Sequence, residues 1–216
     1  MRGEASTDVV RRSLAGMAAS SFTSMDTSTA EQWAVIGAET AKNQARVAER
    51  VLAMLRSLAD IVDGFSTDQL THCLQTATLA ERAGADDEVV VAALCHDIGK
   101  AISVPNHPEI AAAILKPYVR PEVHTMIRLH QDFQGRHYYG HFGGDSDARE
   151  KHRGELSTEE WELAERFADE WDQKAFDPDY DTLPLDHFEP KVRSVFAKAR
   201  FATNPSAGRR YASSET

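Results

Sequence analysis

The stretch that decides the fold is HCLQTATLAERAGADDEVVVAALCHDIGK, residues 72–100. Its centre, Val89–Cys95, is apolar on every side, which predicts a helix buried in the middle of a domain. This helix leads directly into His96 and Asp97. An ionised Asp beside a His at the end of a buried helix is strongly unfavourable unless a cation pairs with it. The sequence therefore predicts a cation, either a metal ion or a side chain, at this point.

Signals for the ends of helices recur on both sides of this stretch. Asp86 suits the start of the buried helix and Gly99 its end, while Pro121 and Pro190 each suit the first turn of a later helix. Elsewhere a Ser or Asn precedes a Glu or Gln by three residues, as at Ser28, Ser66, Asn106 and Ser157. The expected helices cover about residues 29–60, 67–84, 87–98, 107–117, 121–130, 158–175 and 190–200. Since no strand-length alternation occurs, the predicted fold class is all-α, a bundle of about seven helices.

The composition is that of an ordinary globular protein. The 216 residues carry 24 Lys and Arg against 34 Asp and Glu, a formal charge of −10, which argues against nucleic acid and anionic membranes as partners. A small polar or anionic substrate remains compatible, because one local cationic cluster is enough to bind it. The only cysteines, Cys73 and Cys95, lie in apolar runs, so we expect no disulfide framework and a cytoplasmic location. No apolar stretch is long enough to span a membrane.

The chain is expected to hold one domain, residues 28–203, between two tails. Residues 1–27 and 204–216 are rich in small and polar residues, which favours disorder. Met1 and Met25 both remain possible starts. Between residues 131 and 155, glycines, clustered aromatics and charges follow no helical period. A loop of this length in a compact domain is usually functional or disordered, and its histidines and tyrosines favour a lid over a site.

Three further histidines lie on apolar helix faces. His72 is on a largely apolar helix, His107 begins the stripe that continues with Ile110 and Ala111, and His130 ends a similar stripe. A single core histidine is more often a packed, hydrogen-bonded residue than a metal ligand. Four of them on four helices, with an adjacent Asp, favour a metal site.

A carboxylate from the last third of the chain would complete this set. On the helix expected over 158–175, Asp172 borders the apolar face, four residues beyond Ala168. Asp169 points away from that face, so Asp172 is the better candidate. The alternative is that Asp172 is an ordinary solvated acid.

The order of these residues resembles the HD-domain superfamily, in which an H…HD…D pattern holds one metal ion. Two extra histidines before the last Asp resemble its dinuclear branch. The resemblance implies an HD-domain bundle around a two-metal site, with Asp97 as bridging ligand. The implied metal ligands are His72, His96 and Asp172 for one ion and His107 and His130 for the other. This mixed N/O set suits iron, or manganese in a hydrolase, better than magnesium.

Several stretches are similar to the mixed-valence di-iron HD oxygenases, which comprise the myo-inositol oxygenases and the phosphonate-cleaving HD oxygenases. They are residues 72–100, MIRLH at 126–130 and ADEWDQKAFDPDYDTLPLDHFEPKVRSVF at 168–196, and the resemblance covers about residues 55–200. The region between Asp97 and His107 is much shorter than in the myo-inositol oxygenases, and the Tyr and Glu that precede the first His of the phosphonate-cleaving enzymes have no clear match before His72. Neither family's substrate is therefore transferred.

The same resemblance implies substrate contacts. Lys100 lies three residues beyond Asp97, shares the face of the HD pair and matches the substrate-contacting Lys of the cyclitol enzymes. Asp63 resembles their inositol-binding Asp, although its spacing to His72 differs, and Lys174 closely follows Asp172. The remaining candidates lie on the glycine-rich loop: Arg136, His137, Tyr138 and His141.

Three functions fit these residues. The first is a di-iron oxygenase, with O2 as cosubstrate, that cleaves a C–P or C–C bond of a small hydroxylated phosphonate or polyol. The second is a metal-dependent HD-domain phosphohydrolase acting on a nucleotide or phosphate ester. The third is a non-catalytic binding or sensing domain, against which the six intact ligand positions count, because buried charges without a metal are unfavourable.

Overall fold

The computed structural model describes residues 22–200, and these are all-helical: eight α-helices and several shorter helical turns, with no strand among them. The predicted all-α class is confirmed. Most of the predicted N-terminal tail (1–27) and all of the C-terminal one (204–216) lie outside the described residues, so both tails stay predictions. Contacts within the chain divide it into two units, Met1–Val47 and Ala48–Thr216.

The described part of the first unit is one helix with a short turn before it. The 3-10 helix η1 (Met25–Thr27) precedes α2 (Ala30–Gln44), whose N-terminus is closed by a reciprocal capping box between Thr29 and Gln32. The sequence placed this cap one residue earlier, at Ser28. A single helix was expected over 29–60, but α2 ends at Gln44 and α3 (Val47–Ser57) follows after a two-residue break.

The second unit contains the remaining elements. After α3 they are η2 (Leu58–Asp60), α4 (Gln69–Arg82), α5 (Asp87–Cys95), η3 (Ile98–Ala101), η4 (Val104–Asn106), α6 (His107–Leu115), α7 (Pro121–Gln134), η5 (Gly135–His137), η6 (Tyr139–Phe142), η7 (Ala148–His152), α8 (Thr158–Arg166), the π-helical segment η8 (Phe167–Trp171), η9 (Asp172–Lys174) and α9 (Leu185–Phe196).

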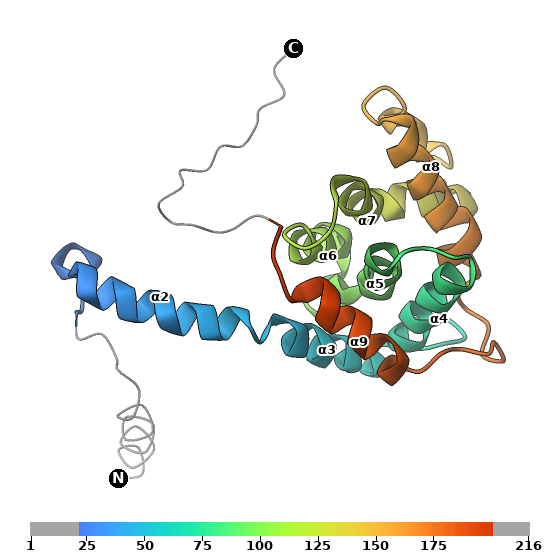
Figure 1. Ribbon diagram of the computed structural model, residues 1–216. Coiled ribbons are helices and arrows are strands. Elements are labelled where there is room, and N and C mark those ends of the chain that lie inside the picture. Colours follow the sequence, from blue (N-terminus) through green and yellow to red (C-terminus); the bar gives the residue numbers. More distant parts are fainter. Residues whose placement is uncertain (1–21, 201–216) are drawn as a thin grey trace, which may run out of the picture. The chain divides into compact units, whose positions relative to one another are not determined.

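Helix α5 is the centre of this bundle. Every residue of Val89–Cys95 is buried, and α4, α7 and α9 pack against the helix (Figure 1). Asp86 caps it as expected, because its carboxylate accepts the backbone N–H groups of Glu88 and Val89. Burying each Val or Leu contributes about 1.5–3 kcal/mol relative to exposure, so this helix supplies much of the core.

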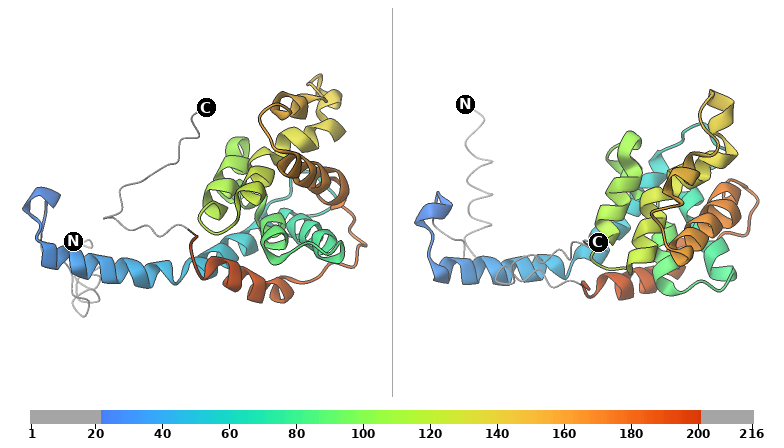
Figure 2. Two further views of the ribbon diagram at one scale, coloured as in Figure 1. Left: turned by 45° about the horizontal axis from the view of Figure 1, so that its top comes forward. Right: turned by 90° about the horizontal axis from the view of Figure 1, so that it is seen from above.

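Helices α7 and α8 pack side by side (Figure 2). Phe133 and Trp161 meet with ring centroids 4.9 Å apart, and Leu129, Ala164 and Ala168 complete a buried cluster around them. This packing fixes the segment that follows α8 against the bundle, which matters for the position of Asp172.

Helix α9 begins earlier than expected. Pro190 was predicted to open a helix, but α9 starts at Leu185 after the N-cap Pro184, and Pro190 lies inside it. An interior proline lacks the N–H of the helix ladder and is unfavourable. Leu185 and Phe188 are both buried on the inner face of α9, so core packing outweighs this penalty.

Candidate metal centre

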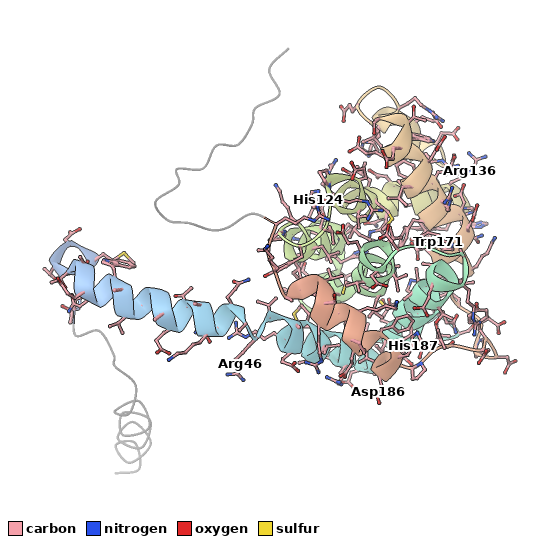
Figure 3. The ribbon with its side chains drawn as sticks, viewed as in Figure 1. Arg46, His124, Arg136, Trp171, Asp186 and His187 are labelled. Carbon is pink, nitrogen blue, oxygen red and sulfur yellow. The ribbon has the colours of Figure 1, made fainter. Side chains whose placement is uncertain are left out.

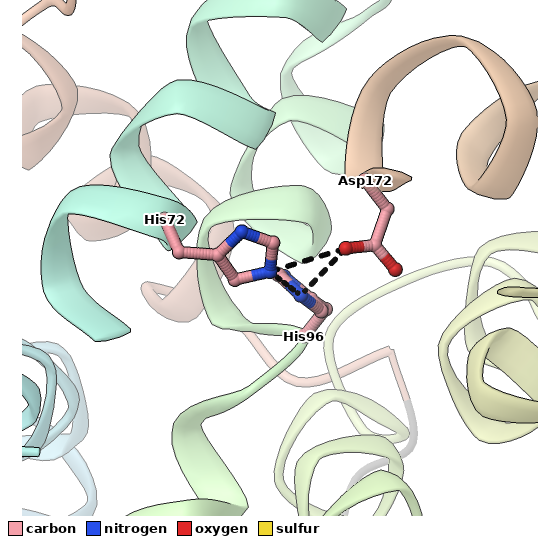
Figure 4. A group of neighbouring side chains, drawn as sticks. All are labelled: His72, His96 and Asp172. Atoms are coloured by element: carbon pink, nitrogen blue, oxygen red, sulfur yellow. Dashed lines mark hydrogen bonds and ion pairs between the residues drawn. The ribbon is translucent and has the colours of Figure 1, made fainter. Parts of the chain in front are cut away.

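The first group of ligand-type side chains comprises His72 on α4, His96 just after α5 and Asp172 at the start of η9. The His72 Nε2 atom lies 3.0 Å from His96 Nε2 and 3.1 Å from Asp172 Oδ1, and the His96 Nε2–Asp172 Oδ1 distance is 3.4 Å (Figure 4). All three side chains are buried. The consecutive helices α4 and α5 and the distant segment η9 thus converge on one point with two imidazole nitrogens and a carboxylate oxygen.

The second group lies next to the first. His107, the first residue of α6, places Nε2 2.9 Å from Asp97 Oδ1 and 3.2 Å from the Nε2 atom of His130 on α7. The His130 Nε2–Asp97 Oδ1 distance is 3.6 Å. His96 is close enough to Asp97 and His130 for these three to form a possible metal-holding group as well.

Asp97 lies between the two groups. Its Oδ2 atom is 3.6 Å from His72 Nε2 and 3.5 Å from His96 Nε2, whereas its Oδ1 atom faces the second pair of histidines. One carboxylate oxygen is therefore directed at each group. The structure brings together all six residues that the sequence singled out.

The four imidazole rings are all oriented in the same way. Each Nδ1 atom lies 2.7–2.9 Å from a backbone carbonyl oxygen, that of Ala175, Ala93, Val104 or Ile127. Because a carbonyl oxygen only accepts hydrogen bonds, each Nδ1 carries a proton, and a ring with no second proton presents its Nε2 lone pair to the centre. Backbone partners of this kind fix the tautomer and orientation of metal-ligating histidines.

The imidazole nitrogens and carboxylate oxygens that face one another in the centre are arranged as expected for a bound cation. If the rings are neutral, no hydrogen lies between the paired Nε2 atoms, so their lone pairs repel each other unless a positive charge is present. Among the described residues, Asp97 Oδ1 and both carboxylate oxygens of Asp172 are buried without a hydrogen-bond partner. Buried unsatisfied acceptors are costly, and metal ions held by the two groups would satisfy these oxygens.

Both carboxylates are held in the charged form. Burial acts to raise the pKa of Asp172, but positive charge on the neighbouring His96 and His72 outweighs it and lowers the pKa below its usual range. A bound cation would supply the same positive charge while the rings are neutral. The same balance, with His96, His107, His130 and Lys100 as neighbours, holds the pKa of Asp97 well below its usual range. Ionised carboxylates are what a metal site requires.

Gly99 explains how His107 reaches Asp97. A Cβ atom at Gly99 would lie 2.3 Å from the backbone oxygen of His107 and 2.7 Å from its Cα atom. Only glycine therefore allows η3 to pack this closely against the start of α6. The sequence assigned Gly99 to ending a helix, but the structure shows that its lack of a side chain permits this close approach.

Asp172 reaches the centre through an irregular helix. The helix expected over 158–175 is regular only to Arg166, and then becomes π-helical over Phe167–Trp171 and 3-10 from Asp172. Such π turns occur frequently at functional sites. Asp172 is fully buried beside His72, while Asp169 is partly exposed, as the choice between them predicted.

Lys100 borders the centre on one side. Its ammonium group lies 2.8 Å from Asp97 Oδ2, donates to Gln69 Oε1 at 3.0 Å and lies 3.9 Å from Asp63 Oδ2. Burial acts to lower the pKa of Lys100, but the Asp97 charge outweighs it and raises the pKa, so the amine stays protonated. Gln69, which also donates to Asp63 Oδ2 at 3.2 Å, was missed as a site residue. Its position one helical turn before His72 was the signal available.

The predicted loop residues differ in their placement. Tyr138 is half-buried, and burial raises the pKa of its hydroxyl, while hydrogen bonds with Gln131 and Tyr139 act to lower it. His137 instead contacts Asp169, with Nε2 2.8 Å from Oδ1. The side chains of three other candidates are exposed, namely Arg136 (Figure 3), His141 and Lys174. Their role as substrate contacts stays a prediction.

The segment 131–155 is more ordered than the sequence suggested. Helix α7 continues to Gln134, and the remainder contains the 3-10 helices η5, η6 and η7 joined by short turns. Its main anchor is the buried Arg149, which donates to both carboxylate oxygens of Asp169 at 3.1 and 3.2 Å. This pairing was not predicted from the sequence, because it joins positions twenty residues apart in different elements.

Comparison with known protein families identifies the part of the chain that contains the two ligand groups. The HD domain family matches residues 70–177, half of the 216-residue chain, and this range spans all six clustered residues. The curated proteins contain no match to the chain. Within residues 22–200, each helix is too short or too polar to cross a membrane.

Proposed function

The chain belongs to the HD-domain family, whose members are generally metal-dependent enzymes, and we propose that it is a di-iron oxygenase. Its reaction would cleave a C–P or C–C bond of a hydroxylated substrate, a phosphonate or a polyol, with O2 as cosubstrate. The observation that carries the proposal is the pair of ligand groups that share Asp97, each with two imidazoles.

His72, His96 and Asp172 would hold one metal ion, His107 and His130 the other, and Asp97 would bridge them. When bound, the two ions would supply the redox chemistry. The backbone carbonyls that accept from each Nδ1 atom keep the rings aimed at the centre without rearrangement. The near-complete burial of all six side chains excludes bulk water.

The donor set supports iron. Imidazole and carboxylate ligands suit mid-row transition metals, whereas magnesium prefers oxygen ligands and water. Neither group of ligands contains a thiol. Burial raises the pKa of Cys95 to about 12 and that of Cys73 well above its usual value, so both remain protonated. A structural zinc site built on thiolates is therefore not supported.

Lys100 would bind the polar group of the substrate. Its ammonium has three N–H donors, of which two are directed to Asp97 and Gln69. Since Asp63 lies 3.9 Å away, beyond hydrogen-bond distance, the third donor is available to a substrate oxygen. Lys100 would hold its proton throughout and orient the substrate.

The alternative is a metal-dependent phosphohydrolase acting on a nucleotide or phosphate ester. One observation favours it: the Lys100 ammonium beside the bridging carboxylate would also suit a phosphate group. This alternative uses the same six residues as metal ligands, but with manganese in place of iron.

The two functions differ in their requirements. We would purify the protein anaerobically from iron-supplemented cells and screen hydroxyphosphonates and cyclitols for oxygen uptake that depends on ferrous iron. The proposal expects bound iron with a coupled mixed-valence signal and oxygen uptake with at least one substrate. Phosphate release from esters with manganese under anaerobic conditions would instead establish the hydrolase. A protein that folds with full stability without metal would favour a binding domain.

A further inference from the structure

Two loops beside Lys100 expose large apolar side chains. Val62 (65% exposed) and Phe65 (49%) lie between η2 and α4, and Ile102 (66%) and Val104 (52%) lie between η3 and α6. We refer to these four residues as the apolar rim. Single exposed apolar residues are normal on a protein surface and need no explanation. Within residues 48–200, however, Phe142 is the only other large apolar side chain with comparable exposure.

The rim is connected to the candidate metal centre. The Phe65 ring stacks on Phe176 with centroids 4.7 Å apart, and Phe176 stacks on His72 at 4.3 Å. A continuous series of aromatic rings therefore runs from the exposed surface to one of the metal-ligand candidates.

On its polar side the rim adjoins Lys100. Val62 is followed directly by Asp63, whose carboxylate accepts from Gln69 and lies 3.9 Å from the Lys100 ammonium. Ile102 is two residues beyond Lys100, and η2 and η3, which precede the two loops, are in contact. The Lys100 side chain is only 13% exposed, so a narrow charged or polar group would reach it more easily than a flat protein surface.

We propose that the substrate is amphiphilic, with a polar or anionic head group that binds Lys100 and an apolar chain that lies on the rim. This inference rests on the proposed function and deepens it by defining the substrate class. Binding of the apolar chain would be favoured because it buries Val62, Phe65 and Ile102, which face water in the free protein. The head group would take the third N–H donor of Lys100, which neither Asp97 nor Gln69 uses.

Binding of a homologous series tests the inference without catalysis. The full chain, loaded with a redox-inactive divalent metal, would be titrated calorimetrically with methyl-, butyl- and octylphosphonate. Affinity should increase by about two- to fourfold for each methylene that reaches the rim. In the double variant Val62→Ser/Ile102→Ser, methylphosphonate should bind as in the wild type and the increase with chain length should be largely lost. Phe142→Ser, which replaces the other exposed large apolar side chain among residues 48–200, is the matched control.

The other outcomes overturn the inference. Equal affinity for all three ligands, or no binding of any of them, would show that the rim does not recognise an apolar chain attached to an anionic head. A concentration-dependent dimer that the double variant dissociates, together with an affinity independent of chain length, would assign the rim to an interface between copies. The number of metal ions bound per chain in the same samples tests the two-metal site separately, and oxygen uptake by the iron-loaded protein tests the oxygenase.

Discussion

The substitution Gly99→Ala tests how the second ligand group is formed. The added Cβ would lie 2.3, 2.7 and 2.9 Å from three backbone atoms of His107, whereas ordinary contacts begin at 3.4 Å. Because backbone cannot rotate away as a side chain can, the start of α6 must move by roughly 1 Å. Overpacking of this kind costs about 1–3 kcal/mol, which lowers Tm by about 3–10 °C in a domain of this size. The same movement should lengthen the 2.9 Å distance between His107 Nε2 and Asp97 Oδ1.

Two measurements on this variant separate stability from site geometry. Urea unfolding gives the loss of stability, and metal titration should show weaker binding of the second ion with the first retained. Gly154→Ala is the control, since a Cβ there meets nothing within 4 Å, and it should change stability by less than about 0.5 kcal/mol. If Gly99→Ala were as stable as wild type and bound both ions equally well, the close approach would not govern the position of His107.

Three further predictions concern other parts of the chain. Arg149→Met should cost about 2–4 kcal/mol in urea unfolding, because it removes a buried cation from Asp169; a loss below 0.5 kcal/mol would show that this pair does not anchor the segment. Burial acts to raise the pKa of Asp86, but Arg120 and the α5 backbone outweigh it and lower the pKa in the folded protein. The ionised carboxylate therefore stabilises the fold at pH values above its unfolded-state pKa, and this stabilisation is lost as the pH falls through its folded-state pKa. Asp86→Asn should therefore cost about 0.5 kcal/mol at pH 7 and almost nothing near pH 2, and a cost independent of pH would contradict this. Burial raises the pKa of Cys95 to about 12, so the native thiol should resist a thiol reagent that reacts rapidly in urea; rapid native reaction would mean that α5 opens.

The helical class and the six clustered residues were predictable because they depend on local patterns. Val89–Cys95 is apolar on all sides, so its burial followed from composition alone, and His96 and Asp97 followed from their place at its end. The choice of Asp172 over Asp169 rested on one helix face. It agrees with the observed burial even though the helix becomes π-helical before Asp172.

Features that depend on packing between distant segments were not predictable. Pro190 was expected to open a helix, but the burial of Leu185 and Phe188 extends α9 over it. The Arg149–Asp169 pair and the Gln69–Lys100 contact join residues whose proximity only the fold creates. The exposure of the apolar rim could not be predicted either, because the sequence alone does not tell whether the apolar residues of a loop pack into the core or face water.

The central claim is that two metal ions share Asp97, and the most direct test is the number of ions bound per chain in the wild type and in His107→Ala. The wild type should bind two and the variant one, because His107 belongs only to the second group. His187→Ala, which removes a histidine at the surface of α9 (Figure 3), should keep both. A wild type with a single ion, or a His107→Ala variant that retains two, would contradict the dinuclear centre.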